Sequence, residues 1–209
     1  MSQTLTGTRP VVADAPPKIS YEDFLVQYDG VHAEWVDGEV ELAMSVSDDH
    51  QRIGNFLIRL MSEFIEANDA GRLFQSEFQM KLVRERRGRE PDLFFVAKSR
   101  LDRLQPSFFD GPGDLVVEIV SPESVSRDTE DKFMEYQSGG VPEYWLIDLS
   151  SRQVSFLQRD ANGLFRRIAP NADGIHYSTG LPGFWVREEW FWQIPTPSMS
   201  AMRKEFGLP

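Results

Sequence analysis

Three charged residues stand out because of where the sequence places them. Glu118 interrupts an apolar run at residues 115–120, and Asp92 opens a second apolar run at residues 93–96. An ionised carboxylate in an apolar strand is costly unless a cation, a proton or a strong hydrogen bond compensates for the lost water. Lys132 follows on a short stretch with helical periodicity. Two such acids and a lysine predict a metal site for phosphodiester chemistry.

The ligand types indicate which metal this site would take. Oxygen-only ligation suits a hard divalent cation, Mg²⁺ or Mn²⁺, better than zinc, and the sequence contains 0 cysteines for a thiolate site. Such an ion lowers the pKa of bound water and neutralises charge that builds up on a phosphate. Lys132 would place an ammonium group beside that phosphate or orient the attacking water.

The site requires two strands and a helix to meet. Residues 92–96 and 115–120 read as central strands, because they are apolar on both faces. If these consecutive strands pair in antiparallel fashion, the start of one lies beside the end of the other, and Asp92 approaches Glu118. Residues 128–138 read as a helix on which Lys132 and Tyr136 share a face. That face must turn toward the carboxylates.

The longest predicted element is a helix over residues 47–70. Ser47 is its expected N-cap and Gly71 its expected stop. One buried stripe follows helical spacing along it: Ile53, Phe56, Leu57, Leu60, Met61, Phe64 and Ile65.

The other elements surround this helix in the sequence. A short helix begins after Ser20, and a hairpin over residues 33–44 turns at Asp37-Gly38. Further predictions are one strand over residues 73–83, a strand pair at 143–149 and 154–158, and a short helix around 187–192. The order indicates an α/β fold with a mixed central sheet flanked by helices. We assign it to one domain at residues 19–195, between a flexible arm (1–18) and a C-terminal tail (196–209).

The overall charge argues against a simple nucleic-acid binder. The sequence has 22 Lys and Arg against 33 Asp and Glu, a net charge of -11, whereas nucleic-acid binders usually carry a basic footprint. Residues 81–89 are the exception, with five basic residues and one acidic residue. This segment is either a solvated hairpin tip or a phosphate-contacting patch beside the site.

Location and assembly are predicted from composition. No apolar stretch approaches the roughly 20 residues that span a bilayer, and the first residues lack the pattern of a signal peptide. The absence of cysteine fits a reducing compartment, so we expect a cytoplasmic protein. Trp190, Phe191 and Trp192 are expected to be exposed and to cover a partner, which favours a homodimer.

Several short motifs follow one another in a specific order. They are Tyr21-Glu22-Asp23-Phe24-Leu25, Glu34-Trp35-Val36-Asp37-Gly38-Glu39, His50, Pro91-Asp92-Leu93, Val117-Glu118-Ile119-Val120-Ser121-Pro122, Asp131-Lys132 with Tyr136, and Gly140-Val141-Pro142-Glu143-Tyr144-Trp145-Leu146-Ile147-Asp148. Over about residues 20 to 190 the chain resembles the Uma-two family of restriction-endonuclease-like proteins, part of the PD-(D/E)XK nuclease superfamily.

The resemblance implies a restriction-endonuclease-like core, with a sheet of about four or five strands, and a Mg²⁺-dependent site. Asp92 and Glu118 match the motif's two acids, and the backbone carbonyl of Ile119 matches a further metal ligand. The sequence departs from the superfamily at Val120, where a lysine is usual, and Lys132 resembles its migrated replacement.

Two further positions match recurrent family residues. The resemblance implies a catalytic role for His50 and a metal-ligand role for Glu34. Read from the residues alone, His50 is more simply a structural histidine at a helix start, and Glu34 more simply a surface residue of a strand.

Three hypotheses remain open from the sequence. The first is a metal-dependent endonuclease that hydrolyses DNA phosphodiesters. The second is a catalytically silent module on a nuclease fold that binds nucleic acid or protein. The third is a purely structural ion pair between Glu118 and Lys132 in an unrelated enzyme.

Overall fold

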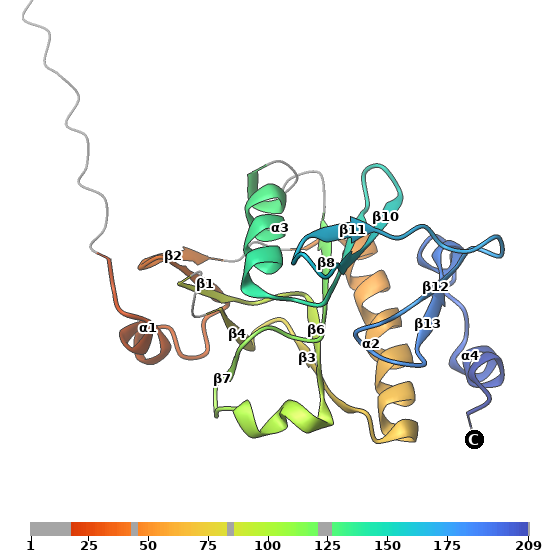
Figure 1. Cartoon of the computed structure of the whole chain (residues 1–209), viewed down its shortest axis with the longest axis horizontal. Helices are drawn as coiled ribbons and strands as arrows, with labels where there is room; N and C mark the ends of the chain where they lie inside the picture. The colour runs from red at the N-terminus through yellow and green to blue at the C-terminus, as the bar shows by residue number, and fades with distance from the viewer. Residues whose placement is uncertain (1–17, 43–45, 83–85, 121–126, 209) are drawn as a thin grey trace, which may run out of the picture.

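The computed structural model describes residues 18–42, 46–82, 86–120 and 127–208, excepting the side chains of residues 127–129. Figure 1 shows an elongated arrangement with the N-terminal hairpin at one end and the C-terminal helix at the other. The predicted arm, apart from residue 18, lies outside the described residues. No helix among the described residues has the length and apolar character needed to cross a bilayer.

A six-stranded mixed sheet forms the centre of the fold. Its order is β11-β10-β9-β8-β6-β3, with bounds Phe165–Arg167, Gln153–Arg159, Glu143–Asp148, Leu115–Val120, Leu93–Ala97 and Gly71–Gln75. Strands β8 and β9 are parallel, and the other neighbours are antiparallel. The mixed sheet confirms the predicted fold class, although it has more strands than the resemblance implied.

A second, five-stranded sheet lies beside the first. Its order is β2-β1-β5-β4-β7, with bounds Glu39–Leu42, Ala33–Val36, Arg87–Arg89, Gln79–Leu82 and Phe108–Asp110. The hairpin of β1 and β2 at Asp37-Gly38 confirms that turn prediction. A small pair, β12 (Ile175–Tyr177) and β13 (Trp185–Arg187), completes the strands.

The prediction of one strand over residues 73–83 is wrong. The chain leaves β3 at Gln75, turns through Glu77 at a left-handed φ of 78°, and enters the other sheet as β4. Phe74 before the turn and Phe78 within it stack on each other, with 4.7 Å between their ring centroids. The apolar pattern therefore continues through the turn, and it does not indicate that the chain changes sheet.

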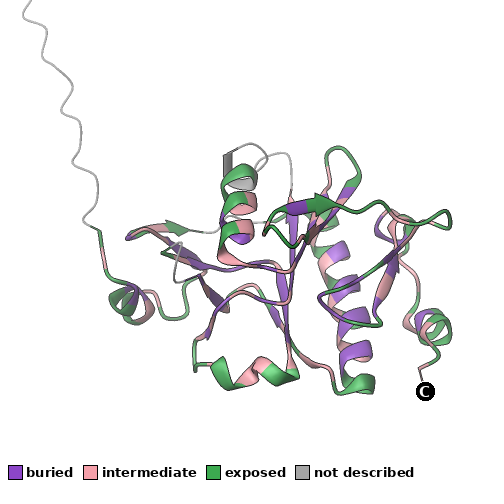
Figure 2. Cartoon of the chain, viewed as in Figure 1, coloured by how far each residue is buried: buried purple, intermediate pink, exposed green. Residues whose placement is uncertain are grey.

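Helix α2 (Asp48–Asn68) packs along the six-stranded sheet. Ser47 caps it, and every residue of the predicted stripe is buried. Figure 2 shows buried residues running along α2 and the central strands. The helix ends before Gly71, because Asp69 already adopts a left-handed φ of 49°; Gly71 instead begins β3.

The remaining helices are shorter. They are α1 (Tyr21–Gln27), α3 (Arg127–Gly139), α4 (Met199–Phe206) and the 3-10 segments η1 (Lys98–Arg103) and η2 (Glu188–Phe191). Ser20 caps α1 as predicted. Helix α4 lies in the segment predicted as a tail; Met202 is buried there and Phe206 stacks on Phe184.

The expected aromatic surface near the C-terminus is wrong. Trp190 is 4% exposed and Phe191 0% exposed, because both pack into the core that α2 shares with the sheet. Trp192 is partly buried against the same core. These residues therefore give no ground for a homodimer, which stays a prediction.

The two faces of the central strands separate the core from the charged residues. Val117 and Ile119 face the core around α2, while Val116 faces a second cluster that includes Tyr136 of α3. Because side chains alternate along a strand, Glu118 lies on the face of Val116. Asp92 is two residues before Phe94, a member of the same second cluster, so the two side chains lie on the same face. Both acids therefore belong to the side that α3 covers.

A buried carboxylate anchors the β12–β13 segment to β9. Glu143 is 0% exposed and accepts hydrogen bonds from the amides of Thr179 and Gly180, each at 2.7 Å. Four side chains also contact it: Trp145, His176, Ser178 and Thr179. A Cβ at position 180 would lie 2.2 Å from the Asp114 carbonyl oxygen, so this approach requires glycine.

The environment of Glu143 predicts an acid-sensitive fold. Burial raises the pKa of Glu143, but the hydrogen bonds led by His176 and Gly180 outweigh it, and the pKa falls below its ordinary 4.5. Because the pKa of Glu143 is lower in the folded state than in the unfolded state, its ionisation stabilises the fold at pH values above the unfolded-state pKa. This stabilisation is lost as the pH falls through the folded-state pKa.

We expect Glu143→Gln to lower the free energy of unfolding by about 3 kcal/mol at neutral pH, since it leaves charge-assisted donors without a carboxylate. Urea denaturation between pH 7 and pH 3 measures this. The difference in free energy of unfolding between the variant and the wild type should become smaller below pH 4.5. Glu66→Gln, on an exposed part of α2, is the control. A difference that stays constant with pH would contradict the interpretation.

Candidate functional site

The two predicted acids lie on neighbouring antiparallel strands. Strands β6 and β8 pair with Leu93 opposite Val117, and continuing this register puts Asp92 opposite Glu118. The Ile119 amide donates a hydrogen bond of 2.7 Å to Asp92 Oδ2, which ties the start of β6 to the end of β8. The predicted strand pairing is confirmed, and the two acids occupy the same edge of the sheet.

Helix α3 brings two side chains to Glu118. Lys132 Nζ lies 3.3 Å from Glu118 Oε1, and the Tyr136 hydroxyl donates to the same oxygen at 2.6 Å. Burial and the charge of Glu118 raise the pKa of Tyr136 far above its ordinary value, so the hydroxyl keeps its proton. The predicted shared face of Lys132 and Tyr136 does turn toward Glu118.

His50 approaches Asp92 from the first turn of α2. Its Nε2 lies 3.1 Å from Asp92 Oδ2, the oxygen that also accepts from Ile119. Burial lowers the pKa of His50, but the hydrogen bond and charge of Asp92, the charge of Glu118 and the Ile119 backbone outweigh it, so the pKa is raised. His50 therefore orients the Asp92 carboxyl group.

Glu34 reaches the site from β1 in the other sheet. Its Oε1 lies 3.2 Å from Lys132 Nζ and accepts from the Glu90 amide at 3.0 Å, while Oε2 accepts from Arg89 at 2.7 Å. Burial raises the pKa of Glu34, but the charges of Lys132 and Arg89 outweigh it and lower the pKa. Glu34 is thus buried and ionised, unlike a surface strand residue.

Sequence analysis did not identify Arg89 and Glu135 as parts of the site. Arg89 is 2% exposed, and its guanidinium contacts Glu34, Glu41 and Glu135. Arg87 also pairs with Glu135, at 2.6 Å. The two-residue spacing of Arg87 and Arg89 could have indicated this role, because it places both side chains on one face of a strand. This face turns toward α3 rather than toward solvent.

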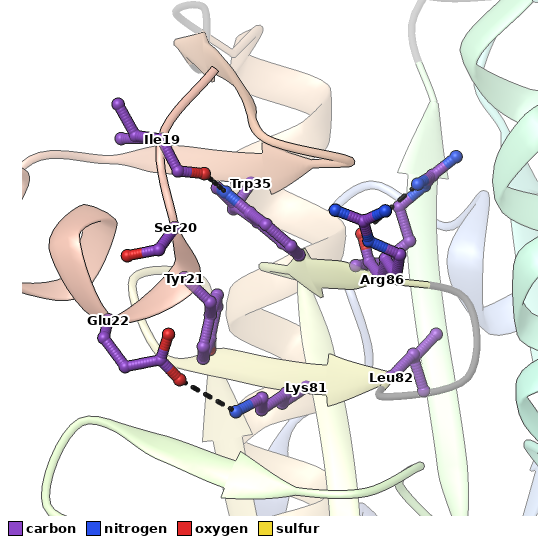
Figure 3. Close-up of a pocket in the computed structure, with 9 residues that line it drawn as sticks. Ile19, Ser20, Tyr21, Glu22, Trp35, Lys81, Leu82 and Arg86 are labelled. Atoms are coloured by element: carbon purple, nitrogen blue, oxygen red, sulfur yellow. Dashed lines mark hydrogen bonds and ion pairs between the residues drawn. The ribbon is translucent and has the colours of Figure 1, made fainter.

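The described basic residues of the segment 81–89 all contact acids of the protein, while residues 83–85 lie outside the described residues. Arg87 and Arg89 contact Glu135, Lys81 lies 3.9 Å from Glu22, and Arg86 lies 3.2 Å from Asp37. Lys81, Arg86 and Arg87 also line a pocket of about 280 Å³ beside α1. Figure 3 shows Lys81 next to Tyr21, with its amine directed toward Glu22. Lys81 Nζ lies 4.5 Å from the Tyr21 ring centroid.

The charges at the centre of the site are incompletely balanced. Burial raises the pKa of Glu118; Lys132 opposes this, and the charges of Asp92 and Glu34 reinforce it, which brings the pKa to about 7. Asp92 Oδ1 and Glu118 Oε2 accept none of the hydrogen bonds found among the described residues. Two carboxylates that repel each other and each retain an oxygen fit a divalent cation.

The donor set fits magnesium better than a metal that needs a complete protein cage. Among the described residues, no group of three or more His, Cys, Asp or Glu side chains is arranged to hold an ion. Mg²⁺ is commonly held by one or two carboxylates, with water and substrate phosphate completing its coordination. Asp92, Glu118 and the Ile119 carbonyl match this requirement.

Comparison with known proteins identifies a family and a shared fold. A family model described as "Uma2: Putative restriction endonuclease" matches residues 20–189. The crystal structure of a putative nuclease belonging to DUF820, from Anabaena variabilis ATCC 29413, has a TM-score of 0.64 and 15% identity, over 77% of this chain and 89% of that chain. At this identity the structural match shows a shared fold. No curated protein matches the chain.

The family match also bears on the third hypothesis. Lys132 and Glu118 do form the ion pair that it required. The pair lies within a segment matched by a nuclease-like family rather than within an unrelated enzyme. Because the matched segment covers most of the sequence, the chain belongs to the Uma2 family of restriction-endonuclease-like proteins.

Proposed function

We propose that this chain is a metal-dependent endonuclease that hydrolyses phosphodiester bonds of DNA. The observation that supports this most strongly is the meeting of Asp92 and Glu118 on paired strands, with Lys132 against Glu118. A buried acid with a perturbed pKa, here Glu118, is typical of a catalytic site. The nuclease-like family gives independent support for the same reaction class.

The metal site of this proposal consists of Asp92, Glu118 and the Ile119 carbonyl, which would hold Mg²⁺ or Mn²⁺. When bound, the ion supplies an acidified water and neutralises charge on the phosphate. His50 holds Asp92 Oδ2, and the Ile119 amide donates a hydrogen bond to the same oxygen. Tyr136 holds Glu118 by its short hydrogen bond.

Lys132 is the proposed electrostatic partner of the substrate. Its ammonium group lies between Glu34 and Glu118, at 3.2 and 3.3 Å, so its position is fixed by two carboxylates from different sheets. From there it orients the attacking water and stabilises negative charge on the phosphate. Such a preorganised cation requires little reorganisation when charge develops.

Glu34 contributes by positioning Lys132. Both of its oxygens already contact donors, namely Lys132, Arg89 and the Glu90 amide. Direct metal ligation by Glu34 stays a prediction, and it would require exchanging one of these contacts. In this proposal the role of His50 is likewise to orient Asp92.

A second function is favoured by one specific feature. The sequence has Val120 where the superfamily usually has lysine, and Lys132 is already paired with Glu118. A catalytically silent module that binds nucleic acid or protein would retain this ion pair for stability. Metal binding distinguishes the two, because the silent module does not require a divalent cation.

The reaction is tested by nicking of supercoiled plasmid in Mg²⁺ or Mn²⁺. We expect Asp92→Asn, Glu118→Gln and Lys132→Met each to lower the rate by roughly 100-fold or more, as the loss of one preorganised electrostatic group does. Glu66→Gln should cleave like wild type, since it is exposed and distant in the fold. Equal cleavage by Asp92→Asn would reject the proposal, and calorimetry without Mn²⁺ binding to wild type would favour the silent module.

The support of Glu34 by Arg89 is tested by stability. Arg89→Met removes the buried cation that Glu34 and Glu135 share, so we expect the free energy of unfolding to fall by about 3–5 kcal/mol. Arg86→Met removes an arginine whose side chain is 68% exposed, and should change stability by less than about 1 kcal/mol. Urea denaturation of both variants measures this. Similar losses in the two variants would contradict the structural role of Arg89.

The basic pocket in Figure 3 is proposed to contact the DNA backbone. Lys81→Ala and Arg86→Ala should weaken binding to DNA of any sequence, and each should reduce the slope of log K against log salt by about 0.9. Fluorescence anisotropy in EDTA, which prevents cleavage, measures both quantities. Lys204→Ala, on exposed α4, is the matched control. Unchanged salt slopes for both pocket variants would exclude these phosphate contacts.

A further inference from the structure

Glu34 is the third acid of the site, and both of its oxygens are already in contact with donors. Oε1 lies 3.2 Å from Lys132 Nζ and accepts from the Glu90 amide at 3.0 Å. Oε2 accepts from Arg89 at 2.7 Å. A metal ion could therefore use Glu34 only by displacing one of these groups, which limits the number of ions that the site can hold.

Glu118 is placed to contact two cations at once. Its Oε1 lies 3.3 Å from Lys132 Nζ and accepts from Tyr136 at 2.6 Å, while its Oε2 accepts no hydrogen bond found among the described residues. Together with Asp92, this second oxygen is enough for one Mg²⁺, which is commonly held by one or two carboxylates and keeps several waters. A carboxylate that offers one oxygen to each of two cations is a bridging ligand.

The Lys132 ammonium group occupies the other side of this bridge. It lies between Glu34 Oε1 and Glu118 Oε1, which belong to different sheets, and its side chain is 13% exposed. An ammonium group has three N–H donors and no acceptor, so it can satisfy two carboxylate oxygens as a cation does. In two-metal sites a pair of ions about 3.5–4 Å apart acts on one phosphate. Here one member of such a pair is matched by a side chain.

The charge of the connected groups leaves a deficit equal to one divalent ion. The described ion pairs link five carboxylates, with Asp92 joined through His50, to three fixed cations: Asp92, Glu118, Glu34, Glu41 and Glu135 with Lys132, Arg87 and Arg89. With His50 counted as neutral, these described groups carry two excess negative charges. One Mg²⁺ or Mn²⁺ neutralises them, whereas a second divalent ion would leave excess positive charge in a largely buried site, which is costly.

We propose that Lys132 takes the place of the second divalent cation of a two-metal site, so that the site binds a single Mg²⁺ or Mn²⁺. This inference rests on the proposed function and adds the stoichiometry of its metal. Two-metal enzymes stabilise the attacking and the leaving oxygen with separate ions, and in this chain a fixed ammonium group supplies one of those two charges. The second charge is therefore present at every concentration of magnesium.

The number of Mn²⁺ ions bound by the full chain tests the proposal, measured by calorimetry and by electron paramagnetic resonance of free Mn²⁺. We expect one ion in the wild type and two in Lys132→Ala, because removal of the ammonium group makes Glu34 Oε1 and Glu118 Oε1 available to a second ion. Two Mn²⁺ ions about 3.5–4 Å apart also give a spin-coupled spectrum, which separate surface ions do not. Lys132→Arg keeps the positive charge and should bind one ion.

A second substitution locates the additional ion. Adding Glu34→Gln to Lys132→Ala should return the stoichiometry from two to one, while Glu66→Gln, on the exposed part of α2, should bind one ion like the wild type. One ion in Lys132→Ala would overturn the inference. Two ions in the wild type would overturn it while leaving the proposed function intact, and this measurement holds even where a variant does not fold. A wild type that binds no Mn²⁺ would refute the metal dependence of the proposed function as well.

Discussion

A chain of alternating charges holds the two sheets of this protein together. It runs from Glu135 through Arg89 and Glu34 to Lys132 and ends at Glu118. The five-stranded sheet supplies Arg89 and Glu34, α3 supplies Glu135 and Lys132, and the six-stranded sheet supplies Glu118. Each buried charge would be costly alone, and each contacts at least one group of opposite charge. The site therefore exists only when all three layers are in place.

Local patterns predicted the parts of the fold that depend on local spacing. The stripe of α2, the Asp37-Gly38 turn, the pairing of β6 with β8 and the face of α3 are all as the sequence indicated. These features follow from periodicity, turn chemistry and the tendency of consecutive strands to pair. The same patterns located Asp92 and Glu118 at one edge of the sheet.

The features that sequence analysis missed depend on contacts between distant segments. Arg89 reads as part of a solvated basic tip until α3 covers it with Glu135. The apolar run that begins at residue 73 resembles one strand in sequence, but its two halves pair with strands of different sheets. Trp190 reads as exposed until it packs near Phe56 of α2. Such partners, far apart in the sequence, cannot be read from periodicity.

The position of Lys132 has a consequence for how this site can vary. A lysine on the same strand as Glu118 would be tied to it by the covalent geometry of the backbone. Here the ammonium group instead reaches Glu118 from α3, across a packing contact shared with Tyr136. The helix can shift or be remodelled while the acidic strands stay unchanged. The two acids and the lysine thus lie on separate elements of the fold, so substitutions within α3 can move the ammonium group without altering the residues of the acidic strands.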